Sequence, residues 1–289
     1  MIQCNQLLVG LPGTGKTTFL AALYHVVESA DIEDSLVLEK LDFDTEYLNT
    51  IREQWLKCET IERTTGSKKQ VGRMVLRVPD SSFRAEVVIP DLLGETFDRQ
   101  FEERRWTKDF SNLVASCNGL IVFIHPDKVV PVRSIMEANY VLGPGADDGS
   151  DVTAPQWNLK DAATQIKMVD ILQFILNEIP EGRLLPIAIV ISAWDRVLDV
   201  MRALGEPSPS EWLGKYLPLL NQFLVSNFER LNYEIFGISA QGGDYEKDSK
   251  KLQGEASRRV LVVTKTGNNR NDISSPIRWI MSIVGSQTS

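Results

Sequence analysis

Residues 10–17 read Gly10-Leu11-Pro12-Gly13-Thr14-Gly15-Lys16-Thr17, which is the complete phosphate-loop pattern G-x-x-x-x-G-K-[ST]. An apolar run from Gln6 to Val9 precedes the pattern, and a helical run from Thr18 to Tyr24 follows it. The glycines allow successive backbone N–H groups to turn inward and form a nest for anions. The alternative is a Gly-rich turn that matches by chance, and the flanking strand and helix disfavour it. The stretch therefore predicts that the chain binds a nucleoside triphosphate.

The polar groups of this loop have separate expected roles. Lys16 brings a positive charge to the β- and γ-phosphates and so belongs to the catalytic group, while the Thr17 hydroxyl ligates Mg²⁺. The helix that follows points the positive end of its dipole at the same phosphates. The residues expected to contact the phosphates are Gly10, Pro12, Gly13, Thr14, Gly15, Lys16, Thr17 and Thr18.

Composition and charge are typical of a globular cytosolic protein. The 289 residues fit one large domain or two small ones, with 43% hydrophobic and 24% charged residues. The net charge of −8 and the pI near 5.0 argue against nucleic acid or an anionic membrane as the main partner. Cys4, Cys58 and Cys117 are scattered, which predicts neither a disulfide framework nor a zinc site. Because no signal peptide or membrane-length apolar run is seen, the expected location is the cytoplasm.

Apolar patterns along the chain alternate between strand and helix periods. The expected strands after the first are Ser35–Leu41, Arg73–Val78, Arg84–Ile89, Leu120–Ile124, Ile187–Ser192, Glu234–Ser239 and a short extra one, Val260–Val263. The expected later helices are Tyr47–Cys58, Asp161–Ile179, Glu211–Leu231 and Pro276–Ile283.

This order predicts an α/β fold, a three-layer doubly wound P-loop domain. Only residues 79–83 separate the strands Arg73–Val78 and Arg84–Ile89, which is too short for a parallel crossover, so the pair should form an antiparallel hairpin. The sheet should therefore be mostly parallel with one antiparallel edge strand. We expect a single domain over residues 1–289, with insertions near residues 31–60, 127–158 and 241–270.

The hairpin ends in Ile89-Pro90-Asp91-Leu92-Leu93-Gly94, the D-x-x-G pattern found at this place in GTPases of the translation-factor-related (TRAFAC) class, which have the Ras-like G domain. Asp91 is expected to hold Mg²⁺ through water, and the Gly94 N–H to bind the γ-phosphate. The alternative for Asp91 is a cap on the helix that follows. The polar segment before the hairpin is in the switch I position, where Thr64 and Thr65 both qualify to close over Mg²⁺ as ligand and catalytic group. Either hydroxyl is otherwise an ordinary loop group.

A later strand leads into Ser192-Ala193-Trp194-Asp195, where a GTPase carries N-K-x-D or T-K-x-D. Asp195 is in the base-reading position, where a carboxylate accepts hydrogen bonds from guanine N1–H and the exocyclic amine. Adenine offers no such pair of donors. Ala193 replaces the lysine whose stem usually lies along the base, and Trp194 can supply a flat surface instead. The alternative for Asp195 is an N-cap.

The next strand leads into Ser239-Ala240-Gln241, which resembles the S-A-K loop whose backbone touches the guanine oxygen. Ser239 and Ala240 are therefore expected to contact the base. Together the two loops favour GTP and GDP over adenine nucleotides as the ligand.

Glu95 follows Gly94 directly, where many GTPases carry the glutamine that orients the attacking water. A carboxylate accepts a hydrogen bond from that water but cannot donate one. Glu95 is therefore a weak catalytic group, a group that needs a nearby cation, or only a first-turn glutamate favoured by the helix dipole. Candidate cations, which are otherwise explained by a solvated surface, are Arg63, Arg99, Arg104 and Arg105. His25 and His125 are expected to be structural.

The N-terminal residues resemble the bacterial double-GTPase proteins of conflict systems. The resemblance covers residues 1 to about 125 and is carried by residues 8–23, Tyr47-Leu48-Asn49 with Trp55, Glu62-Arg63-Thr64 and residues 91–97. It implies a GTP-dependent switch that acts with a second GTPase or an effector. Two other functions remain open from the residues: an ATPase or small-molecule kinase, and a nucleotide-gated scaffold that scarcely hydrolyses GTP. Asp91 is followed by Leu92 rather than an acidic residue, which argues against the ATPase.

Overall fold

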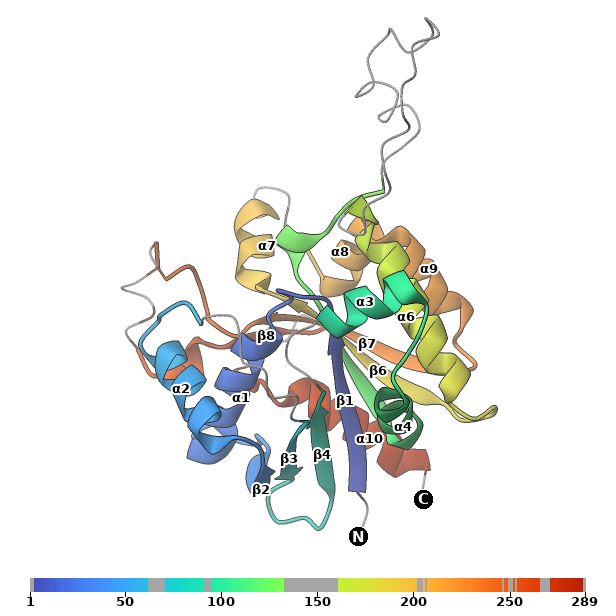
Figure 1. Cartoon of the computed structure of the whole chain (residues 1–289). Coiled ribbons are helices and arrows are strands. Elements are labelled where there is room, and N and C mark those ends of the chain that lie inside the picture. Colours follow the sequence, from blue (N-terminus) through green and yellow to red (C-terminus); the bar gives the residue numbers. More distant parts are fainter. Residues whose placement is uncertain are drawn as a thin grey trace, which may run out of the picture.

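A computed structural model describes residues 3–61, 71–90, 95–132, 161–201, 205, 207–245, 247–248, 252, 254–265 and 271–287. In these residues, eight strands form one sheet with the order β2-β3-β4-β1-β5-β6-β7-β8 (Figure 1). The strands are β1 (Gln3–Gly10), β2 (Val37–Asp42), β3 (Gly72–Arg77), β4 (Arg84–Ile89), β5 (Gly119–Ile124), β6 (Leu185–Ser192), β7 (Leu231–Ser239) and β8 (Leu261–Val263).

Strands β4, β1, β5, β6 and β7 are parallel, and β3 runs antiparallel to both β2 and β4. The predicted hairpin is therefore confirmed, with Gly72 opposite Ile89 and Arg77 opposite Arg84. The mostly parallel sheet with an antiparallel edge is also confirmed. At the other edge, the extra strand β8 pairs antiparallel with β7.

Helices cover both faces of the sheet (Figure 1). They are α1 (Lys16–Ser29), α2 (Thr45–Leu56), α3 (Glu95–Glu103), α4 (Lys108–Ser116), α6 (Thr164–Glu178), α7 (Trp194–Met201), α8 (Pro209–Tyr216), α9 (Pro218–Ser226) and α10 (Ser275–Gln287). The core on one face joins α1, α2 and α10, and the core on the other joins α3, α4 and α6 to α9. In β1, Leu8 belongs to the first core whereas Leu7 and Val9 belong to the second, because strand side chains alternate between faces.

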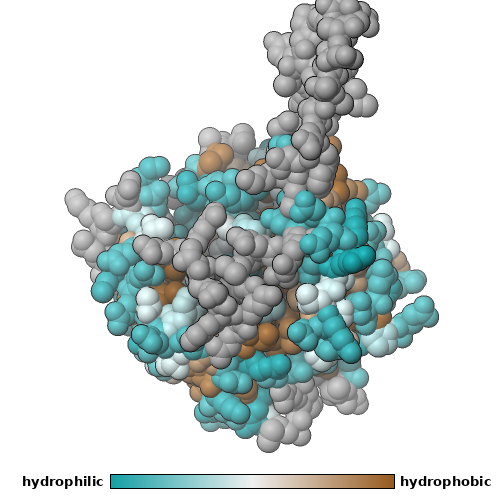
Figure 2. Space-filling model, in the orientation of Figure 1, coloured by the Kyte–Doolittle hydropathy of each residue, from teal (hydrophilic) through white to brown (hydrophobic). Residues whose placement is uncertain are grey.

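The polar exterior is consistent with this two-core arrangement. On the face drawn in Figure 2, the described surface is mostly hydrophilic, with small apolar areas between. Within the described part of the chain, no helix combines the length and apolar character needed to cross a membrane.

The predicted helix Glu211–Leu231 is wrong as a single element. Leu217 has a non-helical backbone (φ −133°, ψ 55°) and Pro218 starts α9, so α8 and α9 are separate helices. Proline cannot continue a preceding helix, because it lacks an N–H and its ring clashes with the turn before it. The segment also ends earlier than predicted, since Leu231 is the first residue of β7. Two short helices, α4 and α7, were not predicted.

We expect Gly237→Ala to lower the free energy of unfolding by about 1–3 kcal/mol, because a core without free space must shift to admit a methyl group. Gly237 lies in β7, and a Cβ there would be 2.3 Å from Cδ2 of the fully buried Trp194. Gly254→Ala is the matched control, since a Cβ there meets nothing within 4 Å. Urea denaturation of both variants checks the prediction, and equal stabilities would contradict the close contact.

Candidate nucleotide-binding site

The predicted phosphate loop connects the end of β1 to the start of α1. Gly13 and Gly15 have left-handed backbones, with φ of 71° and 87°. Residues with a Cβ rarely adopt this conformation, and a Cβ on Gly15 would also lie 3.1 Å from the Ser192 side chain. These two glycines therefore set the turn that brings the start of α1 against the end of β6.

Lys16 is buried, and its ammonium lies inside the loop. Nζ donates to the carbonyl oxygens of Gly10 (2.7 Å) and Leu11 (2.8 Å), and lies 3.4 Å from Thr14 Oγ1. The Thr14 hydroxyl also donates to Leu11 O at 2.8 Å. Thr17 is half-buried in the first turn of α1, directly after Lys16. The loop thus presents a cation and the Thr17 hydroxyl at a helix N-terminus, where anions are favoured.

The two predicted base-reading segments come to the same edge of the sheet. Ser192 ends β6 and Ser239 ends β7, with Ser192 paired to Ile238. Ser192 Oγ donates to Ile124 O at 3.2 Å, which ties this edge to β5. A narrow pocket opens here, lined by Gly15, Thr18, Phe19, Phe123, His125, Val190, Ser192, Ala193, Ile238, Ser239, Ala240 and Gln241. Ligands of open α/β sheets bind at such carboxyl ends of parallel strands.

Asp195 and Ser239 connect the two loops directly. Asp195 lies in the first turn of α7, which begins at Trp194, so it is not the N-cap. Ser239 Oγ accepts a hydrogen bond from Gly242 N–H at 3.0 Å. Burial raises the pKa of the Asp195 carboxyl, and the nearby Ser239 side chain opposes that rise. Asp195 also lines a wider depression together with Gly242 and Arg259.

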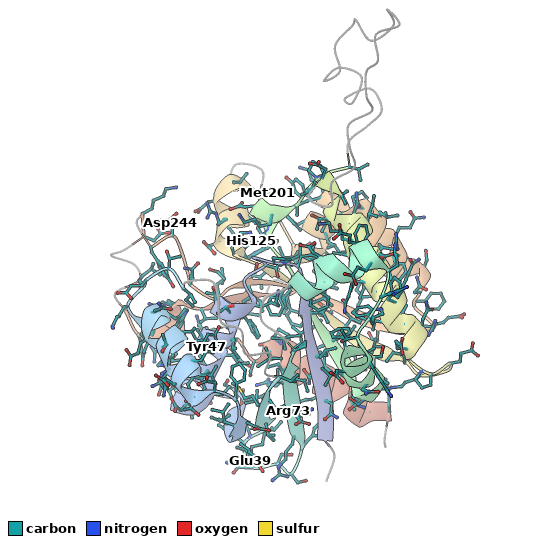
Figure 3. The ribbon with its side chains drawn as sticks, in the orientation of Figure 1. Glu39, Tyr47, Arg73, His125, Met201 and Asp244 are labelled. Atoms are coloured by element: carbon teal, nitrogen blue, oxygen red, sulfur yellow. The ribbon has the colours of Figure 1, made fainter. Side chains whose placement is uncertain are left out.

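Two aromatic residues near the site have structural roles. Trp194 was predicted to offer a flat surface to a base, but its side chain is fully buried against Gly237. That prediction is wrong because the residue fills the core between α7 and β7. His125, which is labelled in Figure 3, lines the narrow pocket, and its Nδ1 accepts a hydrogen bond from Asp127 N–H at 3.2 Å. Burial lowers the pKa of His125, which favours the neutral ring. His125 thereby caps the short 3-10 helix Pro126–Lys128, which is a structural role of the kind expected for it.

The γ-phosphate side is described only in part. Thr64, Thr65, Asp91 and Gly94 lie outside the described residues, as does Arg63. Glu95 is the first residue of α3, but its side chain and that of Arg99 are outside the described set.

Helix α3, which follows D-x-x-G, and the residue directly after it each form an ion pair with α6. Arg104 pairs with Asp170, so this candidate arginine is engaged by α6. Lys167 Nζ lies 3.0 Å from Asp98 Oδ1 and its side chain is only 8% exposed. Lys167 also lines a pocket with Pro12 and Thr14 of the phosphate loop. Sequence reasoning missed this lysine, because nothing local in its helix marks it as facing the loop.

The parallel sheet, with the phosphate loop after its first strand, defines a P-loop protein of the G-domain type. The sequence matches the model of the family Double-GTPase 1 over residues 7–280, so the chain belongs to this family. The resemblance drawn from the first 125 residues is confirmed, and the match extends across the two segments predicted to read the base as well.

The solved structures similar to this chain are distant. A bacterial selenocysteine-specific elongation factor, EF-Sec, is 15% identical, covers 87% of this chain and 28% of its own, and has a TM-score of 0.34. Roco2 RocCORdC of Methanosarcina barkeri bound to GDP is 12% identical, covers 88% of this chain and 48% of its own, and has a TM-score of 0.33. The S. cerevisiae Ski7 GTPase-like domain bound to GTP is 13% identical, covers 84% of this chain and 44% of its own, and has a TM-score of 0.43. The chain thus spans less than half the length of each. No curated protein matches.

Proposed function

We propose that this chain is a GTP-binding switch that hydrolyses GTP to GDP slowly, or with the help of a partner protein. The observation that carries the proposal is the approach of the Ser239 side chain to the Asp195 carboxylate beside the phosphate loop. It brings together the two segments expected to read guanine, at the edge of the sheet where the loop holds Lys16. The carboxylate offers acceptors to guanine N1–H and to its exocyclic amine. Membership in the Double-GTPase 1 family supports the same nucleotide.

On the phosphate side, the chain's own groups have distinct tasks. Lys16 is placed to transfer its hydrogen bonds from the loop carbonyls to β- and γ-phosphate oxygens. The Thr17 hydroxyl is proposed to hold Mg²⁺, with Asp91 and Thr65 as the further proposed ligands. When bound, Mg²⁺ neutralises charge on the β- and γ-phosphate oxygens. The Gly94 N–H is proposed to sense the γ-phosphate.

The test of the nucleotide is a titration of the wild-type protein with fluorescent GDP and fluorescent ADP. We expect tight binding of GDP and binding of ADP that is weaker by about 100-fold, since buried polar groups reject a base that leaves them unpaired. Equal affinity for both would contradict a guanine switch and would favour an ATPase or kinase.

Single-turnover hydrolysis of GTP separates an enzyme from a scaffold. If Glu95 orients the attacking water, Glu95→Ala should lower the rate constant by about 10- to 100-fold without changing the affinity for GDP. Lys167→Met is the companion variant. It removes the buried cation that pairs with Asp98, a residue of helix α3, which also carries Glu95. If the wild type and Glu95→Ala are equally inert, even with the natural partner present, the chain is a scaffold gated by nucleotide.

The affinity for GDP should fall in weakly acidic solution. Asp195 must be ionised to accept hydrogen bonds from guanine, and burial raises its pKa above the ordinary value of 3.8. Above the raised pKa the carboxylate is charged and binding is at full strength; as the pH falls through it, protons compete with the base. GDP titrations from neutral to weakly acidic pH check this. The loss should begin at a higher pH than an ordinary aspartate would give, and Asp195→Asn should lack it.

The proposed biological role follows from the family. The family resemblance supports a role in a bacterial multi-component conflict system, with a second GTPase or an effector as the partner. A single sheet formed by strands from Gln3 to Val263 supports one domain. We propose a cytoplasmic location, which the free cysteines Cys4, Cys58 and Cys117 support, and we propose neither nucleic acid nor an anionic membrane as a partner, which the acidic charge of the chain supports.

A further inference from the structure

Helix α2 contacts the base-reading loop that follows β7 (residues 239–242) through one tryptophan. Trp55 lies near the C-terminal end of α2 and is fully buried. Its Nε1–H donates to the carbonyl oxygen of Ala240 at 2.9 Å, across 185 residues of sequence. The Trp55 ring also contacts His25 of α1, with ring centroids 5.3 Å apart. One side chain therefore connects α1, α2 and the loop that follows β7.

Arg259 holds the other side of this connection. Its guanidinium lies 4.1 Å from the centroid of the Trp55 ring and donates to the Trp55 carbonyl oxygen and to Cys58 Sγ, the latter at 2.9 Å. The backbone of Arg259 also lies against Gly242 of the base-reading loop. Gly242 has a φ of 83°, and a Cβ there would lie 2.2 Å from Arg259 O. Arg259 thus contacts both the tryptophan and the loop that the tryptophan anchors.

The loop fixed in this way begins beside the base-reading group, Asp195 of α7. Ala240 is the residue directly after Ser239, whose side chain lies near the Asp195 carboxylate. A buried carbonyl that loses its donor must be exposed to water or left unpaired, which costs more than the hydrogen bond alone is worth. Without the indole N–H, we expect the loop from Ser239 to Gly242 to shift. The position of the Asp195 carboxylate oxygens, which accept hydrogen bonds from the base, should change as a result.

We propose that Trp55 and Arg259 are positioning residues that set the affinity for guanine nucleotide, because they fix the loop at Ala240. The same two residues couple this loop to helix α2. The inference rests on the proposed guanine site. Coupling is reciprocal, so a nucleotide that orders the loop must also steady the end of α2.

The reactivity of Cys58, which lies just after the C-terminal end of α2, can report on the order of that end. It is half-buried and accepts the hydrogen bond from Arg259, whereas Cys4 and Cys117 are buried. Burial raises the pKa of the Cys4 thiol to about 11 and that of the Cys117 thiol to about 12, so neither forms the reactive thiolate at neutral pH. Alkylation of the native protein by iodoacetamide therefore reports on Cys58.

The experiment measures dissociation of fluorescent GDP from the wild type and from Trp55→Phe. A second variant carries 3-benzothienylalanine at position 55, which keeps the size of the indole but has sulfur in place of the N–H. The control is Trp279→Phe in α10, a partly buried tryptophan of the same core that contacts Phe236. We expect GDP to leave both position-55 variants roughly 5- to 10-fold faster, as for the loss of one buried hydrogen bond, and the control to stay within about twofold.

The second measurement is the rate of Cys58 alkylation with and without GDP. GDP should slow alkylation in the wild type and in Trp279→Phe but not in the position-55 variants. A merely structural role for Trp55 would lower stability without removing this protection. If Trp55→Phe fails to fold, the isosteric variant decides. Wild-type dissociation rates and intact protection in the isosteric variant would overturn the proposal while leaving the guanine site standing. Failure of the wild type to bind GDP would overturn the proposed function itself.

Discussion

Lys16→Ala is expected to abolish nucleotide binding, raising the Kd for GDP by about 100-fold or more. The Lys16 ammonium is buried within the phosphate loop and already within hydrogen-bond distance of Gly10 O and Leu11 O. The chain is acidic overall, with a net charge of −8, so distant charges do not attract a polyphosphate. Removal of one buried partner of a charged contact commonly costs about 2–5 kcal/mol, and each 1.4 kcal/mol is tenfold in affinity.

The measurement is a titration with fluorescent GDP, accompanied by thermal unfolding to show that the variant folds. Lys108→Ala is the matched control, because Lys108 is exposed at the start of α4. Lys16→Arg keeps the charge but not the shape of the donor, so it should bind poorly as well. Tight binding by Lys16→Ala would contradict the position assigned to the phosphates.

Asp195→Asn is expected to exchange the base that the protein prefers. The affinity for GDP should fall by about 100-fold, because the amide presents a donor where guanine also presents donors. Xanthine carries an oxygen in place of the exocyclic amine, so the asparagine amide can donate to that oxygen and accept from N1–H. Fluorescent XDP should therefore bind the variant better than it binds the wild type.

Asp199→Asn controls for the loss of charge, since Asp199 lies one helical turn further along α7. Folding should not suffer in Asp195→Asn, because burial already raises the pKa of Asp195 and so disfavours its ionised form in the fold. Loss of GDP without gain of XDP would mean that Asp195 supports the pocket but does not read the base. Unchanged affinity for both would place the base elsewhere.

Elements with strong local signals were predicted well. The hairpin of β3 and β4 followed from the short connection after Arg77, which admits no other pairing. The break at Pro218 shows the limit of this reasoning. Apolar periodicity continues through the site, so the pattern alone suggested one helix where the proline starts a second.

The site divides in the same way. The phosphate loop was evident in eight consecutive residues, whereas Trp194 was assigned wrongly, Lys167 was missed and Trp55 was not connected to the site. Each has an ordinary helical context, and only its partner gives it a role. For Trp194 that partner is Gly237, for Lys167 it is Asp98, and for Trp55 it is Ala240.

The sequence by itself therefore determined the phosphate loop, the parallel sheet behind it and the family. Backbone groups of neighbouring residues form an anion nest, and the glycines that permit it appear in order along the chain. Only the tertiary structure joined Asp195 to Ser239 and Trp55 to Ala240. Those contacts depend on strand order in the sheet and on helices that cross it, which no local pattern contains.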